Sequence, residues 1–133
     1  MTDAPSLKAK DLMSRKPLSF TPEMDLREAV KKLVERRVSG APVVDKQGNL
    51  CGMLTERDYL QAAFSASYHQ ELVGRVEDFM SRDVQTVDLD ENLMDLASRF
   101  LQSDYRSYPV MEGNRLVGLI GRGDVLRAML AFA

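Results

Sequence analysis

The chain carries one sequence unit twice, and this internal repeat constrains its fold more than any other feature does. The segment Asp11-Leu12-Met13-Ser14-Arg15 recurs as Asp78-Phe79-Met80-Ser81-Arg82. Matches that keep their order along a whole unit are hard to obtain by chance, so we predict two copies of one structure. The further matches are Leu26 with Leu93, Pro42 with Pro109, Val43 with Val110 and, after one residue is dropped in a turn, Leu50 with Leu116, Gly52 with Gly118, Asp58 with Asp124 and Leu60 with Leu126.

Each copy shows the same succession of patterns, which predicts the order strand, helix, strand, strand, helix. A short extended stretch precedes an apolar stripe at helical spacing, with Asp25 and Asn92 as the predicted N-caps. Two short strands then flank a turn that contains Gly and Asn, which favours a β-hairpin. A second helix starts at about Thr55 in the first copy and at about Gly121 in the second. The predicted strands are 18–21, 41–44 and 50–54, then 85–88, 109–111 and 116–120.

The predicted fold class is α/β, of the α+β type, with two β-α-β-β-α repeats. One repeat of roughly 55 residues buries too little apolar surface to be comfortably stable alone. We therefore expect the repeats to share a face around a pseudo-two-fold axis and to form one globule with clefts on either side. The first repeat is predicted to span 1–64, the connector 65–75, and the second repeat 76–133.

Composition argues against several classes of function. The formal net charge of −2 disfavours non-specific binding of nucleic acid, which requires a basic excess. No apolar run approaches the roughly 20 residues that span a bilayer, and the first residues lack the order of a signal peptide. The single cysteine, Cys51, favours a reducing cytoplasm. No spacing resembles a metal site and no residues assemble a reaction centre, so we expect neither a metal, a required cofactor nor enzymatic activity.

Three motifs of the first copy resemble those of a CBS domain. They are Asp-Leu-Met-Ser near the start, Ser-Gly-Ala-Pro-Val-Val-Asp at 39–45, and Gly-Met-Leu-Thr-Glu-Arg-Asp at 52–58. The second copy, with Tyr-Pro-Val at 108–110 and Gly-Leu-Ile-Gly-Arg-Gly-Asp at 118–124, resembles another. From about Leu7 to Leu130 the chain therefore resembles a tandem CBS pair, often called a Bateman module.

This resemblance implies a stand-alone regulatory module rather than an enzyme. Such a pair would sense an adenosine-containing ligand, namely AMP, ADP, ATP or S-adenosylmethionine, in clefts between its two repeats. It would then modulate an unknown protein partner in trans or act through its own oligomer. Members of the family commonly pair two modules into a disc, so we expect a homodimer.

In the first cleft the resemblance places a ribose on Thr55-Glu56-Arg57-Asp58. The Asp58 carboxylate can accept hydrogen bonds from both the 2′- and the 3′-hydroxyl. Thr55 adds a hydroxyl at a helix start, whose free N–H groups favour an anion, and Arg57 is placed to meet a phosphate. The base would contact backbone groups beside the middle strand. The other predicted residues of this cleft are Ser19, Thr21, Gly40, Ala41 and Pro42.

The second cleft departs from this pattern and is predicted to bind weakly or not at all. Gly121 replaces Thr55, so a hydroxyl is missing, while Asp124 remains. Asp88 replaces Thr21 and adds a negative charge, which Arg122 can offset. The predicted residues of this cleft are Thr86, Tyr108, Pro109, Arg122 and Asp124.

Two alternatives stay open. Ser/Thr-x-x-Asp is also an ordinary capping box at a helix start, a role that is compatible with contact to a ribose. The chain can also be a ligand-independent dimerisation or scaffold module with degenerate clefts. Intact Thr55 and Asp58 favour sensing, whereas Gly121 and Asp88 favour loss of binding in the second cleft.

Overall fold

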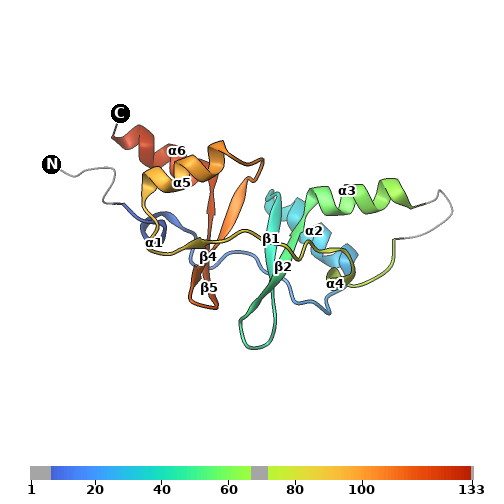
Figure 1. Cartoon of the computed structure of the whole chain (residues 1–133). Coiled ribbons are helices and arrows are strands. Elements are labelled where there is room, and N and C mark those ends of the chain that lie inside the picture. The colour runs from blue at the N-terminus through green and yellow to red at the C-terminus, as the bar shows by residue number, and fades with distance from the viewer. Residues whose placement is uncertain (1–6, 67–71, 133) are drawn as a thin grey trace. The chain divides into compact units, whose positions relative to one another are not determined.

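The computed structural model describes residues 7–66 and 72–132 and contains both helices and strands (Figure 1). The chain divides into two compact units. We call Leu18–Val84 the central unit, and the described parts of Met1–Pro17 and Gln85–Ala133 the terminal unit. Residues 67–71 of the predicted connector lie outside the described residues. The predicted sequence boundaries of the repeats and the connector stay predictions.

The central unit is built on an antiparallel hairpin of β1 (Gly40–Val44) and β2 (Leu50–Thr55). Phe20 adds a parallel bridge to Val43, and its N–H donates to the carbonyl oxygen of Pro42 at 3.0 Å. The helices of this unit are α2 (Leu26–Arg36), α3 (Glu56–Ser65) and α4 (Val76–Phe79). Its buried core consists of Phe20, Leu26, Ala29, Leu33, Ala41, Val43, Leu54, Val76 and Met80.

Helix α2 forms where the apolar stripe predicts it, and both of its ends are capped. The Asp25 side chain accepts a hydrogen bond from the Glu28 N–H at 3.1 Å, which satisfies one of the donors that a helix start leaves free. The helix ends at Arg36, and the C-cap residue Arg37 takes the left-handed conformation with φ 55°. The predicted N-cap is thus confirmed.

The terminal unit repeats the hairpin and adds a third strand. Strand β4 (Ser107–Glu112) pairs antiparallel with β5 (Arg115–Gly121) and parallel with β3 (Val87–Asp88). The predicted N-cap Asn92 accepts a hydrogen bond from the Asp95 N–H at 2.9 Å. The helices of this unit are α1 (Ala9–Leu12), α5 (Leu93–Leu101) and α6 (Arg122–Ala131). Its buried core consists of Ala9, Val87, Leu93, Leu96, Tyr108, Val110, Ile120, Val125 and Ala128.

Each unit takes its opening motif from the other copy of the repeat. In Figure 1, α1 lies with α5 and α6 of the terminal unit, although it comes from the N-terminal end of the chain. In the same way α4 lies with α2 and α3 of the central unit. Ser14 forms an antiparallel bridge to Leu119 in β5, and Ser81 forms one to Met53 in β2. The two copies therefore exchange their first segments.

Two hairpin glycines make room for the exchanged segments. A Cβ atom on Gly52 would lie 2.5 Å from the carbonyl oxygen of Ser81. A Cβ atom on Gly118 would lie 2.5 Å from Met13 Sδ and 2.7 Å from the carbonyl oxygen of Ser14. These distances are far below van der Waals contact, so only glycine fits at either position. The glycines and the Met-Ser pairs recur together because they pack against one another across the two copies.

The two predicted hairpins are confirmed, but the strand bounds and the early extended stretch of each copy differ from the prediction. The strands start earlier, at Gly40 and Ser107, and both hairpins carry a register shift, at Val43/Val44 and at Val110/Met111. The extended stretch 18–21 is reduced to the bridge at Phe20, and 85–88 to the two residues of β3. Helices α1 and α4 were not predicted, because four residues are too few to show a periodic apolar pattern.

Candidate ligand-binding site

The predicted residues of the first cleft all lie in the central unit, on adjacent segments. The bridge at Phe20 holds the segment 19–21 alongside β1, and Gly40 in β1 is paired with Thr55 at the end of β2. The Glu56 N–H donates to the carbonyl oxygen of Ser39 at 2.8 Å, which fixes the start of α3 against the start of β1. Ser19 and Thr21 are exposed on either side of buried Phe20. The early segment, the middle strand and the helix start thus occupy neighbouring positions.

Asp58 is held in a reciprocal capping box at the start of α3. Its Oδ2 accepts the Thr55 N–H at 2.9 Å, and its own N–H donates to Thr55 Oγ1 at 3.1 Å. The predicted capping role is therefore confirmed. Its second carboxylate oxygen, Oδ1, accepts a hydrogen bond from the Ser81 hydroxyl at 2.9 Å. The Asp58 carboxylate thus caps the helix with one oxygen and accepts from an alcohol with the other.

Ser81 is a neighbour of Asp58 that was not predicted from the sequence. Ser81 follows Met80 in the exchanged segment, where its N–H and carbonyl pair with the backbone of Met53, each at 2.9 Å. These two hydrogen bonds fix the Ser81 backbone beside β2. The Ser81 hydroxyl can still turn away from Asp58, because this needs rotation about only one side-chain bond. The only signal in the sequence was the recurrence of Ser14 as Ser81.

The other residues of the first cleft differ in what they can offer. Gly40, Ala41 and Pro42 are buried, so contact with a base would have to come from their backbone. A Cβ atom on Gly40 would lie 3.0 Å from Thr55 Cγ2, which keeps this position small. Arg57 is exposed on the first turn of α3.

In the terminal unit Asp124 occupies the place of Asp58 but has a different partner. Its Oδ2 accepts the Gly121 N–H at 2.7 Å, and its Oδ1 accepts from Arg127 Nη2 at 2.5 Å. This ion pair was not foreseen from the sequence, although Arg127 follows Asp124 at helical spacing. Arg122 is exposed, and its N–H donates to the carbonyl oxygen of Arg106 at 3.0 Å.

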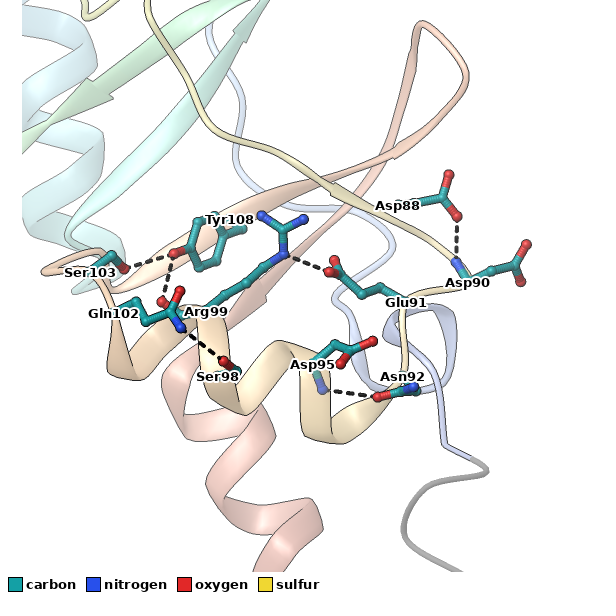
Figure 2. A network of polar contacts seen from close by, with 10 residues as sticks. All are labelled: Asp88, Asp90, Glu91, Asn92, Asp95, Ser98, Arg99, Gln102, Ser103 and Tyr108. Carbon is teal, nitrogen blue, oxygen red and sulfur yellow. Dashed lines mark hydrogen bonds and ion pairs between the residues drawn. The ribbon is translucent and has the colours of Figure 1, made fainter.

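Figure 2 shows the polar network of the terminal unit around Tyr108, near the start of β4. Tyr108 is buried, and its hydroxyl bonds to Ser103 Oγ at 2.7 Å and to the carbonyl oxygen of Arg99 at 3.1 Å. The side chain of Tyr108 is therefore fully engaged in the core, so a ligand would meet only the backbone of Tyr108 and of its buried neighbour Pro109. Glu91 Oε1 pairs with Arg99 Nε at 2.6 Å.

Asp88 has a structural role that was not predicted from its sequence context. Its Oδ1 accepts the Asp90 N–H at 2.8 Å, which fixes the turn between β3 and α5 (Figure 2). Asp88 is nevertheless exposed, and Thr86, just before β3, is half-buried. Among the described ion pairs none joins Asp88 to Arg122, so the expected compensation between these two charges is not a direct contact.

Three further features of the described residues concern metal ligands, membrane spans and the single cysteine. Within 7–66 and 72–132 no group of three or more His, Cys, Asp or Glu side chains is placed to hold a metal ion. Across these same residues no helix has both the length and the apolar character needed to cross a membrane. Cys51 is half-buried, and burial is the main reason that the pKa of its thiol is raised. A raised pKa keeps the thiol protonated and unreactive at neutral pH.

The similarity to known proteins agrees with this geometry. A family model of the CBS domain matches residues 9–65 and 76–131. The chain belongs to the CBS domain family. The two matches fall on the two copies of the repeat, so the predicted pair of CBS repeats is confirmed.

Relatives of this CBS pair include both small proteins and longer chains. The chain is 29% identical over 116 residues to the CBS domain-containing protein YhcV of Bacillus subtilis, covering 87% of this chain and 81% of YhcV. It is 28% identical over 120 residues to the uncharacterized protein MJ1225 of Methanocaldococcus jannaschii, covering 90% of this chain and 42% of MJ1225. It spans only 14% of the A-adding tRNA nucleotidyltransferase of Aquifex aeolicus, at 27% identity over 123 residues. The chain thus spans less than half the length of several relatives.

Solved structures of CBS pairs are similar over nearly the whole chain. The CBS domain pair of protein MJ0100, in complex with 5′-methylthioadenosine and S-adenosyl-L-methionine, has a TM-score of 0.82 at 25% identity, covering 97% of this chain and 100% of that chain. CBSX2 in complex with AMP, a CBS-pair protein of Arabidopsis thaliana, has a TM-score of 0.79 at 29% identity, covering 94% and 97%. Both of these neighbours bind adenosine-containing ligands.

Proposed function

We propose that this CBS pair is a regulatory module that binds an adenosine-containing ligand through its central unit and modulates a protein partner in trans. The ligand would be AMP, ADP, ATP or S-adenosylmethionine. The complexes of MJ0100 and CBSX2 support this chemical class of ligand. On this proposal the chain works by binding rather than by catalysis, and its single cysteine, Cys51, which has no partner for an internal disulfide, fits a reducing cytoplasm.

One observation carries the proposal, namely the hydrogen bond from the Ser81 hydroxyl to Asp58 Oδ1 at 2.9 Å. A ribose hydroxyl is the same kind of donor, so it can take the place of Ser81 without a change in the role of Asp58. The capping bond from Thr55 to Oδ2 holds the carboxylate in place meanwhile. A hydrogen bond to a charged acceptor is stronger than one to a neutral acceptor. The 2′- and 3′-hydroxyls of a ribose would therefore bind the Asp58 carboxylate more strongly than they would bind a neutral side chain.

The remaining first-cleft residues complete the proposed site. Arg57 is exposed on the first turn of α3, one position before Asp58, so its guanidinium would meet a phosphate there. The Glu56 and Asp58 N–H groups already donate to the Ser39 carbonyl and to Thr55 Oγ1. Gly40 to Pro42 would present backbone groups to the base, with Ser19 and Thr21 beside them. The terminal unit would bind more weakly, through Asp124 and the backbone of Tyr108 and Pro109.

A homodimer is also part of the proposal. Each unit carries large apolar side chains that are exposed on its helices, and exposed apolar surface favours interaction with a partner. A symmetric pair of chains would bury these side chains against a second copy. The side chains are Val34, Leu60, Phe64, Met94, Leu101, Leu126 and Leu130. The same residues favour the second candidate function, a ligand-independent scaffold.

A thermal-shift screen separates sensing from scaffolding. The purified protein is melted with AMP, ADP, ATP and S-adenosylmethionine, and with 2′-deoxy-AMP as the matched control that lacks one ribose hydroxyl. A ligand at 100 times its Kd adds about 2.7 kcal/mol of stability, which a melting curve resolves. We expect a rise in Tm with at least one ribonucleotide and a smaller rise with the deoxy form. Identical curves in all five mixtures would favour the scaffold.

A further inference from the structure

We propose that Arg127 is the residue that sets the ligand affinity of the terminal unit, by occupying the carboxylate oxygen of Asp124 that a ribose would need. This inference rests on the proposed function. It assigns a specificity-determining role to a side chain outside the motifs of the repeat.

The two acidic residues are held in the same way by the backbone. Asp58 Oδ2 accepts the Thr55 N–H at 2.9 Å, and Asp124 Oδ2 accepts the Gly121 N–H at 2.7 Å. In both units one oxygen is thereby committed to the helix start. The oxygen left for a ligand is Oδ1, and the two units differ in what occupies it.

In the central unit the occupant is the neutral Ser81 hydroxyl, whereas in the terminal unit it is the Arg127 guanidinium. A hydroxyl both donates and accepts, and one bond rotation moves it away from Asp58. The guanidinium only donates, and its bond to a carboxylate is charge-assisted and therefore stronger. A ribose must break that ion pair before it can bind Asp124.

Local sequence explains why Arg127 reaches Asp124. Gly123 has no side chain, and a Cβ atom at this position would lie 3.2 Å from Arg127 Nη1. The guanidinium therefore lies across the first turn of α6 in the space that Gly123 leaves free. At the offset that aligns Asp58 with Asp124, the counterparts in α3 are Arg57 and Gln61, so the central unit has neither the gap nor the cation.

The expected effect is modest, because the Arg127 side chain is 73% exposed and that of Asp124 is 26% exposed. Exposed ion pairs are weakened by solvent. Removing the Arg127–Asp124 pair therefore changes the affinity of Asp124 for a ribose by only a small factor. Replacing Arg127 by the glutamine found in the central unit should tighten binding to the terminal unit by about two- to fivefold.

The test is a titration of ¹⁵N-labelled protein with adenosine, followed by NMR. Adenosine carries no phosphate, so loss of the Arg127 charge cannot weaken binding through a lost phosphate contact. Backbone signals of Gly121 and Gly123 report on the terminal unit, and those of Thr55 and Asp58 report on the central unit. The variants are Arg127→Gln and, as the matched control that keeps the positive charge, Arg127→Lys.

We expect Arg127→Gln to lower the Kd of the terminal unit about two- to fivefold and to leave the Kd of the central unit unchanged, while Arg127→Lys stays near the wild-type values. An unchanged or weaker terminal site in Arg127→Gln would overturn the role of Arg127, provided that the central unit binds. A central unit that also fails to bind adenosine or AMP would instead overturn the proposed function, and this inference with it.

Discussion

At the residue scale, Gly118 marks a place where one added carbon atom meets atoms that cannot easily move. A Cβ atom there would lie 2.7 Å from the backbone oxygen of Ser14 as well as close to Met13. We expect Gly118→Ala to lower the free energy of unfolding by about 1–3 kcal/mol, as overpacking does in well-packed interiors. Urea unfolding followed by circular dichroism measures this change.

Gly123→Ala is the matched control for that substitution. Gly123 is exposed in α6, and its nearest neighbour is the flexible side chain of Arg127. Alanine is the better helix former, by about 0.8–1 kcal/mol in a helix interior and by less in the first turn, so this variant should stay close to the wild type in stability. If Gly118→Ala unfolded at the same urea concentration as Gly123→Ala, the close packing of Met13 and Ser14 on β5 would be wrong.

At the residue scale, local contacts of the site were predictable from the sequence and distant ones were not. The pattern Thr-x-x-Asp was enough to predict the capping box of Thr55 and Asp58, because it is local. The partners on the other carboxylate oxygens were not predictable in the same way. Ser81 reaches Asp58 from 23 residues along the chain, and Arg127 depends on the gap at Gly123.

At the scale of elements, strands and caps follow from the sequence, whereas the exchange of opening segments does not. Two short strands flanking a turn with Gly and Asn predicted each hairpin, and Asp25 and Asn92 cap their helices as predicted. The partner of each Met-Ser motif lies on the other copy of the repeat, and no local pattern encodes such a distant contact. Gly52 recurs as Gly118 in the sequence, but the reason for this recurrence, close packing against a Met-Ser segment, is visible only in the structure.

The exchange predicts how fragments of the chain behave. Val76 and Met80 belong to the buried core of the central unit, and Ser81 pairs with β2. A fragment of residues 18–84 contains Val76, Met80 and Ser81. A fragment of residues 1–66, nearly equal in length, lacks all three. Either half alone has a small core, so we expect a comparative result, with 18–84 unfolding more cooperatively and at higher temperature than 1–66.

Differential scanning calorimetry of the two fragments measures this difference. Their similar length makes each the control for the other, since a general effect of truncation would act on both. A cooperative transition in 1–66 together with none in 18–84 would contradict the exchange and favour two units that follow the order of the sequence.

At the scale of the whole molecule, the chain has two similar helix starts with unequal carboxylate environments. Asp58 faces a hydroxyl, and Asp124 faces a guanidinium. The proposed function assigns ligand sensing mainly to the first of these. A sensor with one stronger site responds to its ligand over one concentration range. The ligand can change binding of the partner only as far as its own affinity differs between the two conformations of the sensor.

The most direct test of this account is isothermal titration of AMP into the wild type and into Asp58→Ala. Asp25→Ala is the matched control, because it removes a helix-capping carboxylate from the same unit without touching the proposed site; losing a cap costs about 0.5–2 kcal/mol of stability in either variant. We predict that Asp58→Ala loses AMP binding in the central unit while Asp25→Ala binds like the wild type. Undiminished affinity in Asp58→Ala would contradict the assignment of the ribose to Asp58.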